Sequence, residues 1–316
     1  MFEKILFATS ASPSCDDAAR VAFELSRKNR SKLIVYHVFG LPGRGFSLTY
    51  RDVRTGEAED VDENLVSLVK EEMAQYYEKL AKDHPSSAYE TATGVPHTEI
   101  LRKARKEDAS LIIMGAHTRE EDVGAMRHRA IAGSTMQKVA KSARCPVLIV
   151  SRPCVTCWSY FANIVVATDF SKSSDYAFQF ARNVAKEIGC KLHVFHCVDI
   201  GPEGQASTAT QAYIEQQLAA AEKKVQDKYV ANMGDFDNYV LALREGTPHV
   251  EVLKYARENK SDLIVMAHHT KDVDPELALL GSTIEQVVLR SACPVLSVNH
   301  PDKVDVSPYG VPRSGE

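Results

Sequence analysis

The chain has 316 residues, a hydrophobic share of 44%, a charged share of 25%, a formal net charge of -4 and a sequence pI near 6.3. This length is enough for two domains with full hydrophobic cores, and the balanced charge gives no general attraction to nucleic acid or to anionic membranes. No apolar run approaches the roughly 18 residues of a membrane-spanning helix, and MFEKILFATS begins directly with a strand pattern. We therefore expect a cytoplasmic protein without a membrane span and without a nucleic-acid partner.

The first half alternates short β-branched runs with amphipathic helices. The runs lie at residues 5–9, 33–38, 111–114 and 147–150. Continuous apolar runs of this length are typical of parallel strands buried on both faces. Ser12-Pro13 is a favourable N-cap and N1 pair for the first helix, and a longer helix is expected over about 63–82. The predicted buried face of the first helix is Ala18, Val21, Ala22 and Leu25.

The second half repeats the first. Residues 4–10 return as 163–169, an offset of 159. GVPHTEILRKARKEDASLIIMGAH (94–117) returns as GTPHVEVLKYARENKSDLIVMAHH (246–269), an offset of 152, and the GST and CPVL blocks return at an offset of 148. Ordered blocks of this kind identify an internal duplication whose copies differ in loop length. The second copy of the first helix would bury Ala177, Phe180, Ala181, Val184 and Ile188, and a second long helix is expected over about 211–231.

The predicted fold is therefore two tandem α/β domains, each a doubly wound parallel sheet of five strands. We assign 1–152 to the first domain, 153–160 to a linker, 161–300 to the second domain and 301–316 to a polar tail. Residues 40–62 are expected to form a long loop, and 116–131 an insertion. Cys145, Cys197 and Cys293 are expected to be buried free thiols, as in a reducing compartment.

Ligands of a doubly wound sheet bind beyond the carboxyl ends of the strands. Four loops of each copy converge there, and the last of them opens a helix with Gly133-Ser134-Thr135 or Gly281-Ser282-Thr283. Ser134 with Gln137, and Ser282 with Glu285, fit a capping box. Free backbone N–H groups at such a helix start can also hold phosphate. From the sequence alone, two interpretations of these helix starts stand side by side: a simple helix cap and a phosphate site.

The blocks ILFATS, IVVATDFS, LIIMGAH and the two GST…CPVL segments resemble the universal stress protein (UspA) superfamily in its tandem form. The resemblance covers nearly the whole chain apart from the loop, the insertion and the tail. It implies an adenine nucleotide α-hydrolase-like, Rossmann-like fold and a cytoplasmic regulatory module of the stress response, often a homodimer or bound to a protein partner. It also implies ATP or another adenine nucleotide as ligand, held by an Asp at the end of strand one and a G-x2-G-x9-G-[S/T] loop.

The resemblance assigns a nucleotide site to each copy. The second-copy residues are Ala167, Thr168, Asp169, Val198, Met266, His268, Gly281, Ser282 and Thr283. The first-copy residues are Thr9, Val38, Gly115, His117, Gly133, Ser134 and Thr135. Both copies depart from the family pattern: Ser10 stands where the second copy has Asp169, and Ala267 stands where the first copy has Gly115. The second copy is the better candidate because it keeps the carboxylate.

Other constellations give weaker expectations. Cys154 and Cys157 in the linker have the C-x2-C spacing of half a zinc site or a redox pair, although Trp158 could anchor the linker hydrophobically instead. No other metal site is expected, His37 and His196 should be packed in strands, and no residue is assigned a catalytic role. The alternatives to nucleotide binding are an adaptor with empty clefts, a slow ATPase, or thiol redox chemistry at the linker.

Overall fold

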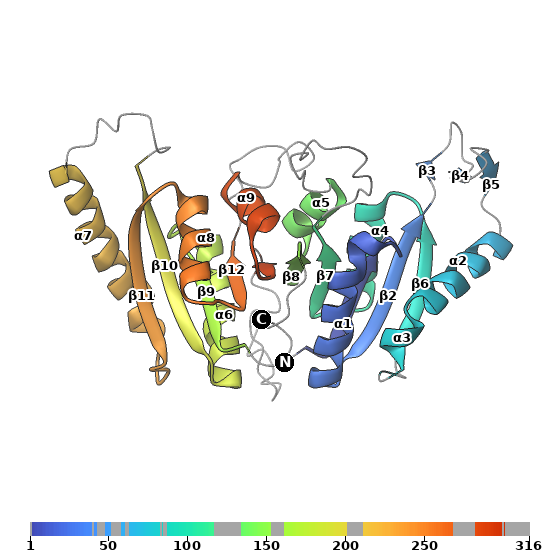
Figure 1. The fold of residues 1–316 in the computed structure, drawn as a ribbon, viewed down its shortest axis with the longest axis horizontal. Helices are drawn as coiled ribbons and strands as arrows, with labels where there is room; N and C mark the ends of the chain where they lie inside the picture. The colour runs from blue at the N-terminus through green and yellow to red at the C-terminus, as the bar shows by residue number, and fades with distance from the viewer. Residues whose placement is uncertain are drawn as a thin grey trace, which may run out of the picture. The chain divides into compact units, whose positions relative to one another are not determined.

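The computed structural model describes residues 2–39, 41–42, 48–51, 58–60, 63–82, 84, 87–116, 134–152, 161–200, 211–267, 282–298 and 300. The chain divides into two compact units, residues 2–151 and residues 152–316 (Figure 1). Within the described residues no helix is long and apolar enough to cross a membrane.

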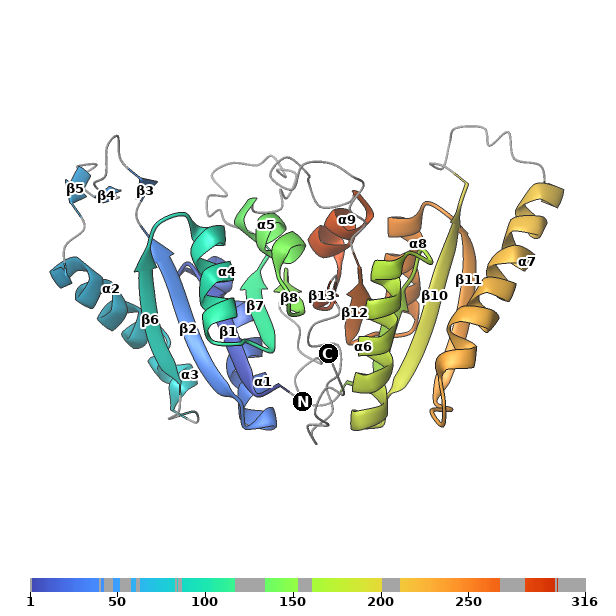
Figure 2. The same ribbon diagram turned by 180° about the vertical axis from the view of Figure 1, so that it is seen from behind.

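The first unit is a parallel sheet in the order β8-β7-β1-β2-β6. Its strands are β1 (Lys4–Thr9), β2 (Lys32–Phe39), β6 (Ala88–Thr93), β7 (Leu111–Gly115) and β8 (Val147–Val150). Its helices are α1 (Asp16–Asn29), α2 (Glu63–Tyr76), α3 (Glu78–Ala81), α4 (Pro96–Lys106) and α5 (Ser134–Ser142). Helix α1 lies on one face of this sheet, and α4 and α5 pack together on the other, as the two opposite views show (Figures 1 and 2).

The second unit has the same plan, with a parallel sheet in the order β11-β10-β9-β12-β13. Its strands are β9 (Asn163–Ala167), β10 (Lys191–Asp199), β11 (Tyr239–Gly246), β12 (Leu263–Met266) and β13 (Val295–Ser297). Its helices are α6 (Lys172–Ile188), α7 (Gln211–Lys228), α8 (Pro248–Glu258) and α9 (Ser282–Arg290). The predicted fold, two tandem doubly wound parallel sheets of five strands, is confirmed.

The cores form where the sequence predicts them. The central strands are buried over most of their length, with Ile5, Leu6 and Phe7 fully inaccessible in β1. Ala18, Val21 and Ala22 of α1 are buried and Leu25 is half-buried. Ile188 is 41% exposed, contrary to prediction, and it is the last residue of α6. The five cysteines within the described residues, including Cys145, Cys197 and Cys293, are buried free thiols.

Three local expectations are wrong. Residues 40–62 are not only loop: β3 (Leu41–Pro42), β4 (Leu48–Arg51) and β5 (Ala58–Asp60) pair antiparallel in a separate small sheet. Ser12 does not cap α1, because a 3-10 turn over Pro13–Cys15 comes first and the Ser12 hydroxyl bonds to side chains of its own loop. The long helix of the first unit is also interrupted at Tyr77, between α2 and α3.

Candidate functional site

In the second unit, a sharp turn leads from the end of β9 into α6. Ser171 caps α6 by accepting a hydrogen bond from Ser174 N at 3.2 Å. Phe170 has a φ of +65°, a left-handed conformation that is unfavourable for a bulky side chain. The Phe170 N–H donates to Thr168 Oγ1 at 3.0 Å. The turn therefore depends on local hydrogen bonds to hold a conformation that the chain does not favour by itself.

This turn presents the Asp169 carboxylate at the carboxyl end of the sheet. Asp169 Oδ1 accepts from Ser171 N at 2.9 Å and from Ser174 Oγ at 2.5 Å, while the residue itself is exposed. Burial of the carboxyl group acts to raise the pKa of Asp169, but the hydrogen bonds from Ser171 and Ser174 outweigh it and hold the pKa below its usual value. The group is thus ionised and fixed in orientation at neutral pH.

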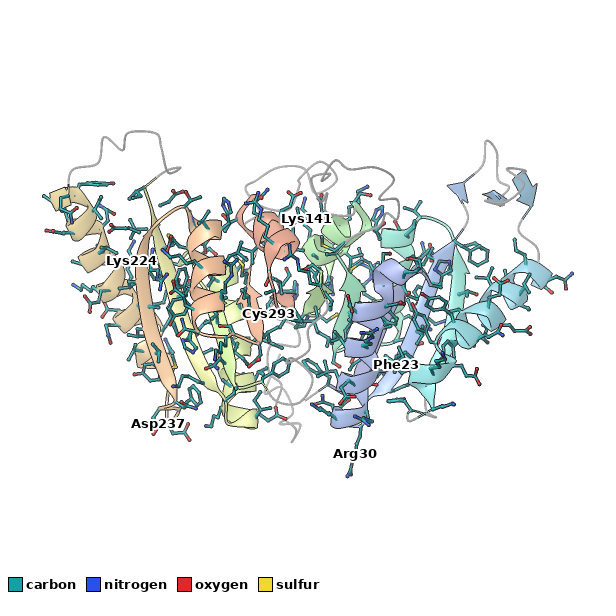
Figure 3. The ribbon with its side chains drawn as sticks, in the orientation of Figure 1. Phe23, Arg30, Lys141, Lys224, Asp237 and Cys293 are labelled. Carbon is teal, nitrogen blue, oxygen red and sulfur yellow. The ribbon has the colours of Figure 1, made fainter. Side chains whose placement is uncertain are left out.

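An aromatic cluster lies beside the carboxylate. The Phe170 ring lies 4.3 Å from the His196 ring, and Lys224 Nζ lies 5.5 Å from the Phe170 ring centroid (Lys224 is labelled in Figure 3). His196 Nδ1–H donates to the Thr168 carbonyl oxygen at 2.8 Å. Burial lowers the pKa of His196 against the raising effects of that bond and of Asp169. His196 is therefore a neutral, hydrogen-bonded residue at neutral pH, in agreement with the expectation of a packed histidine.

The first unit builds the same turn from neutral groups. Ala11 has a φ of +52°, and its N–H donates to Thr9 Oγ1 at 2.9 Å. Ser10 replaces the carboxylate, and its hydroxyl lies 2.7 Å from Ser12 Oγ and 3.2 Å from Cys15 Sγ. The backbone geometry is therefore retained, but the first unit has no acidic side chain at the end of its first strand.

In each unit, a hydrogen bond between a threonine and a tyrosine holds the turn after the first strand. Thr9 Oγ1 lies 2.6 Å from Tyr77 OH, and Thr168 Oγ1 is bonded in the same way to Tyr229 OH. Both pairs are buried. Sequence analysis missed the two tyrosines, although their recurrence at the offset of 152 was a usable signal.

The remaining predicted residues of the described part fall into two groups. Ala167 and Met266 are buried at the ends of their strands, and Ser134, Thr135 and Thr283 lie in the first turns of α5 and α9. Val38 and Val198 are half-buried near the ends of β2 and β10, but they do not correspond to each other. Val38 pairs with Ala92 in the first unit, and Cys197 pairs with Arg244 in the second. Because Ala92 and Arg244 are equivalent at the offset of 152, Cys197 is the counterpart of Val38.

The glycine at the end of β7 has a close neighbour. A Cβ on Gly115 would lie 3.2 Å from the Ser14 carbonyl oxygen and 3.6 Å from Cys15 Sγ. Ala267 occupies the equivalent position after β12 and carries that Cβ. In the first unit the backbone at Gly115 therefore lies close to the loop at Ser14. The second unit has the methyl group of Ala267 at the equivalent position.

Part of the phosphate side of the predicted sites lies outside the described residues, namely His117, Gly133, His268, Gly281 and the side chain of Ser282. The linker cysteines Cys154 and Cys157 also lie outside them. Across the described ranges, no group of three or more His, Cys, Asp or Glu side chains is arranged to hold a metal ion. Zinc at the linker cysteines stays a prediction.

Comparisons with known proteins agree with the duplication. The model of the "Universal stress protein family" matches residues 1–151 and again residues 161–299. A curated relative, Universal stress protein MJ0531 of Methanocaldococcus jannaschii, is 31% identical over 151 residues, which cover 45% of this chain and 85% of the relative.

Solved structures share the fold over nearly the whole chain. A universal stress protein from Archaeoglobus fulgidus matches with a TM-score of 0.62 and 22% identity over 95% of this chain and 97% of its own. The functionally unknown protein PA1789 from Pseudomonas aeruginosa matches with a TM-score of 0.63 and 18% identity over 96% of this chain and 94% of its own.

Proposed function

The chain belongs to the universal stress protein family, with one domain of that family in each half, and from this we propose that it is a regulatory module of the stress response whose second half binds an adenine nucleotide. The proposed role is binding, in which the chain forms a homodimer or binds a protein partner. No residue is assigned a catalytic function.

The observation that carries this proposal is the Asp169 carboxylate. Its orientation is set by two hydrogen bonds to Oδ1, and its low pKa keeps it charged at neutral pH. A carboxylate only accepts hydrogen bonds, so it suits the donors of a nucleoside, namely ribose hydroxyls and the adenine amino group. The site therefore fits an adenine nucleotide on its nucleoside side.

The two halves differ in what they can offer such a ligand. Ser10 gives the first half a neutral hydroxyl that already interacts with Ser12 and Cys15. Ala267 gives the second half a methyl group where close backbone approach to phosphate would favour glycine. We accordingly expect one nucleotide per chain, bound through the second half, with weaker phosphate contacts than a glycine would allow.

The first experiment asks what the purified protein carries. Heating it and identifying the released small molecules by mass spectrometry should yield an adenine nucleotide. Calorimetric titration of stripped protein with ATP, AMP and cAMP then gives the affinity and the preferred ligand. Asp169→Ala should weaken binding by about 10- to 100-fold, the usual effect of losing hydrogen bonds to a charged group.

The matched control is Ser10→Ala, which changes the equivalent position of the first half and should leave the affinity unchanged. Sub-stoichiometric adenine in both the wild type and Asp169→Ala, together with no titration heat, would exclude nucleotide binding and favour the adaptor alternative. Equal losses in Ser10→Ala and Asp169→Ala would contradict the assignment to the second half.

A further inference from the structure

Lys228, the last residue of α7, contacts the turn that carries Asp169. Its Nζ donates to the Phe170 carbonyl oxygen at 2.7 Å and forms an ion pair with Asp175 Oδ1 at 2.9 Å. The side chain of Lys228 is 35% exposed and that of Asp175 is 30% exposed. An ion pair at this exposure contributes little to the free energy of folding. The stability of the pair with Asp175 therefore does not account for the position of Lys228 against the turn.

The carbonyl that Lys228 holds belongs to the peptide group between Phe170 and Ser171. The N–H of that same group donates to Asp169 Oδ1 at 2.9 Å. Because a trans peptide is planar, its C=O and N–H point in opposite directions, so fixing the oxygen also fixes the direction of the N–H. A cation on the oxygen further polarises the peptide and strengthens its N–H as a donor. Lys228 and Asp169 are thus linked through one peptide group.

The first half has neither end of this link. Tyr77 and Tyr229 are equivalent, so Tyr76 occupies the position of Lys228, and its hydroxyl donates to Asp16 at 2.9 Å. Ser10 occupies the position of Asp169. The left-handed turn itself is present in both halves, at Ala11 and at Phe170. A lysine is therefore not needed to form the turn, and it occurs in the half that has the carboxylate.

We propose that Lys228 is a positioning residue for Asp169: it orients and polarises the Phe170–Ser171 peptide, and thereby prepares the carboxylate to receive the hydrogen-bond donors of a nucleoside. The ligand part of this proposal rests on the proposed function, whereas the link between Lys228 and Asp169 can be tested in the protein without any ligand.

The first test is the titration of the Asp169 carboxyl group by carbon-detected NMR in ligand-free protein. Lys228→Met should raise the pKa of Asp169 by about half a pH unit or more, because the N–H donor is weakened and less well directed. Lys228→Arg, which can still donate to the carbonyl, should restore the wild-type value. The matched control is Lys224→Met, which removes the same charge from the same helix at a residue that lies over the Phe170 ring and not at its carbonyl. All variants should melt within about 4 °C of the wild type.

The second test is nucleotide affinity in a double-mutant cycle. Lys228→Met should weaken binding about 3- to 10-fold, which is the usual effect of losing one hydrogen bond. Lys228→Arg should weaken binding by less than about twofold. In the Asp169→Ala background, Lys228→Met should have no further effect, because its influence passes through the carboxylate. Additive losses would overturn the positioning role.

The two proposals fail in different ways. If no nucleotide binds the wild type, the proposed function fails and the titration still decides the role of Lys228. If the pKa of Asp169 changes equally in Lys228→Met and Lys224→Met, the positioning role is overturned, because the change then reflects only the loss of a nearby positive charge.

Discussion

A buried histidine in the second half gives a sharp prediction about stability at mildly acidic pH. His193 lies in β10 with 4% of its surface exposed, and its ring makes two hydrogen bonds. Nδ1 lies 2.8 Å from Tyr255 OH, and Nε2 lies 3.3 Å from Asn163 Oδ1. Both bonds are satisfied by the neutral ring, with Nε2–H donating to the amide oxygen and Nδ1 accepting from the phenol. Ile34 occupies the equivalent position in β2, so His193→Ile replaces the histidine by the residue that the first half uses.

The magnitude follows from proton linkage. Burial, assisted by Lys191, lowers the pKa of His193 in the folded state from its ordinary value of 6.5. Unfolding therefore takes up a proton below pH 6.5, and the stability that is present above that value is lost as the pH falls toward the folded pKa. If the native ring stays neutral, acidification from about pH 7.5 to about pH 5.5 removes at most about 1.4 kcal/mol through this residue.

Urea unfolding of the full-length wild type and of His193→Ile at these two pH values measures the effect. His196 and His249 in the second half, and His37 in the first, also have lowered pKa values, so the wild type has acid sensitivity from several sources. The difference between the two proteins isolates the part due to His193. The variant should be less stable near pH 7.5, because Tyr255 and Asn163 lose a partner, but it should lose less stability on acidification. Equal acid-induced losses, or an His193 ring that titrates near pH 6.5 in the native protein by NMR, would refute the reasoning.

Two further predictions concern the turns at the strand ends. Tyr77→Phe and Tyr229→Phe each remove a buried hydroxyl bonded to a threonine, and each should lower the free energy of unfolding by about 1 kcal/mol in urea titrations; no change in either would mean that the bond adds nothing to the turn. Gly115→Ala places a Cβ 3.2 Å from the Ser14 carbonyl oxygen, so the loop must move by a few tenths of an ångström and the melting temperature should fall by a few degrees. An unchanged melting temperature for Gly115→Ala would mean that the loop yields freely.

The central strands could be predicted closely because they are buried on both faces. Apolar runs at 5–9 and 111–114 become β1 (Lys4–Thr9) and β7 (Leu111–Gly115), with boundaries shifted by at most one residue. Burial on both faces allows only apolar side chains there, so the run itself is the signal. The duplication then implies that both halves have the same strand order, and they do.

Two of the edge strands, β6 and β11, have no such apolar run. β6 has the sequence AYETAT and is half-buried throughout, and β11 mixes exposed and half-buried positions. Their side chains are half-buried or exposed, so polar residues are tolerated there and the apolar run disappears. The small sheet of β3, β4 and β5 was missed for a similar reason, since its strands are two to four residues long.

The candidate site was predictable on the strand side and not on the helix side. Thr168 and Asp169 follow a recognisable strand, so their place at the carboxyl end of the sheet follows from the topology. Tyr229 and Lys228 come about 60 positions later on the chain, and they reach the turn because α7 packs on β10 and β11 and ends beside it. Local periodicity predicts a helix there, but it does not say which residue of the helix will meet the turn.

The turn after the first strand separates what the fold needs from what a ligand would need. Both halves keep the threonine–tyrosine bond and the left-handed residue that follows, although one has alanine and the other phenylalanine there. Since the backbone conformation survives this change, it is a requirement of the strand-to-helix connection and not of ligand binding. The groups that differ, Ser10 against Asp169 and Tyr76 against Lys228, are those without which the turn still forms. A carboxylate introduced at Ser10 alone would therefore lack the lysine that orients its peptide donor, so a matching carboxylate site in the first half needs changes at both Ser10 and Tyr76.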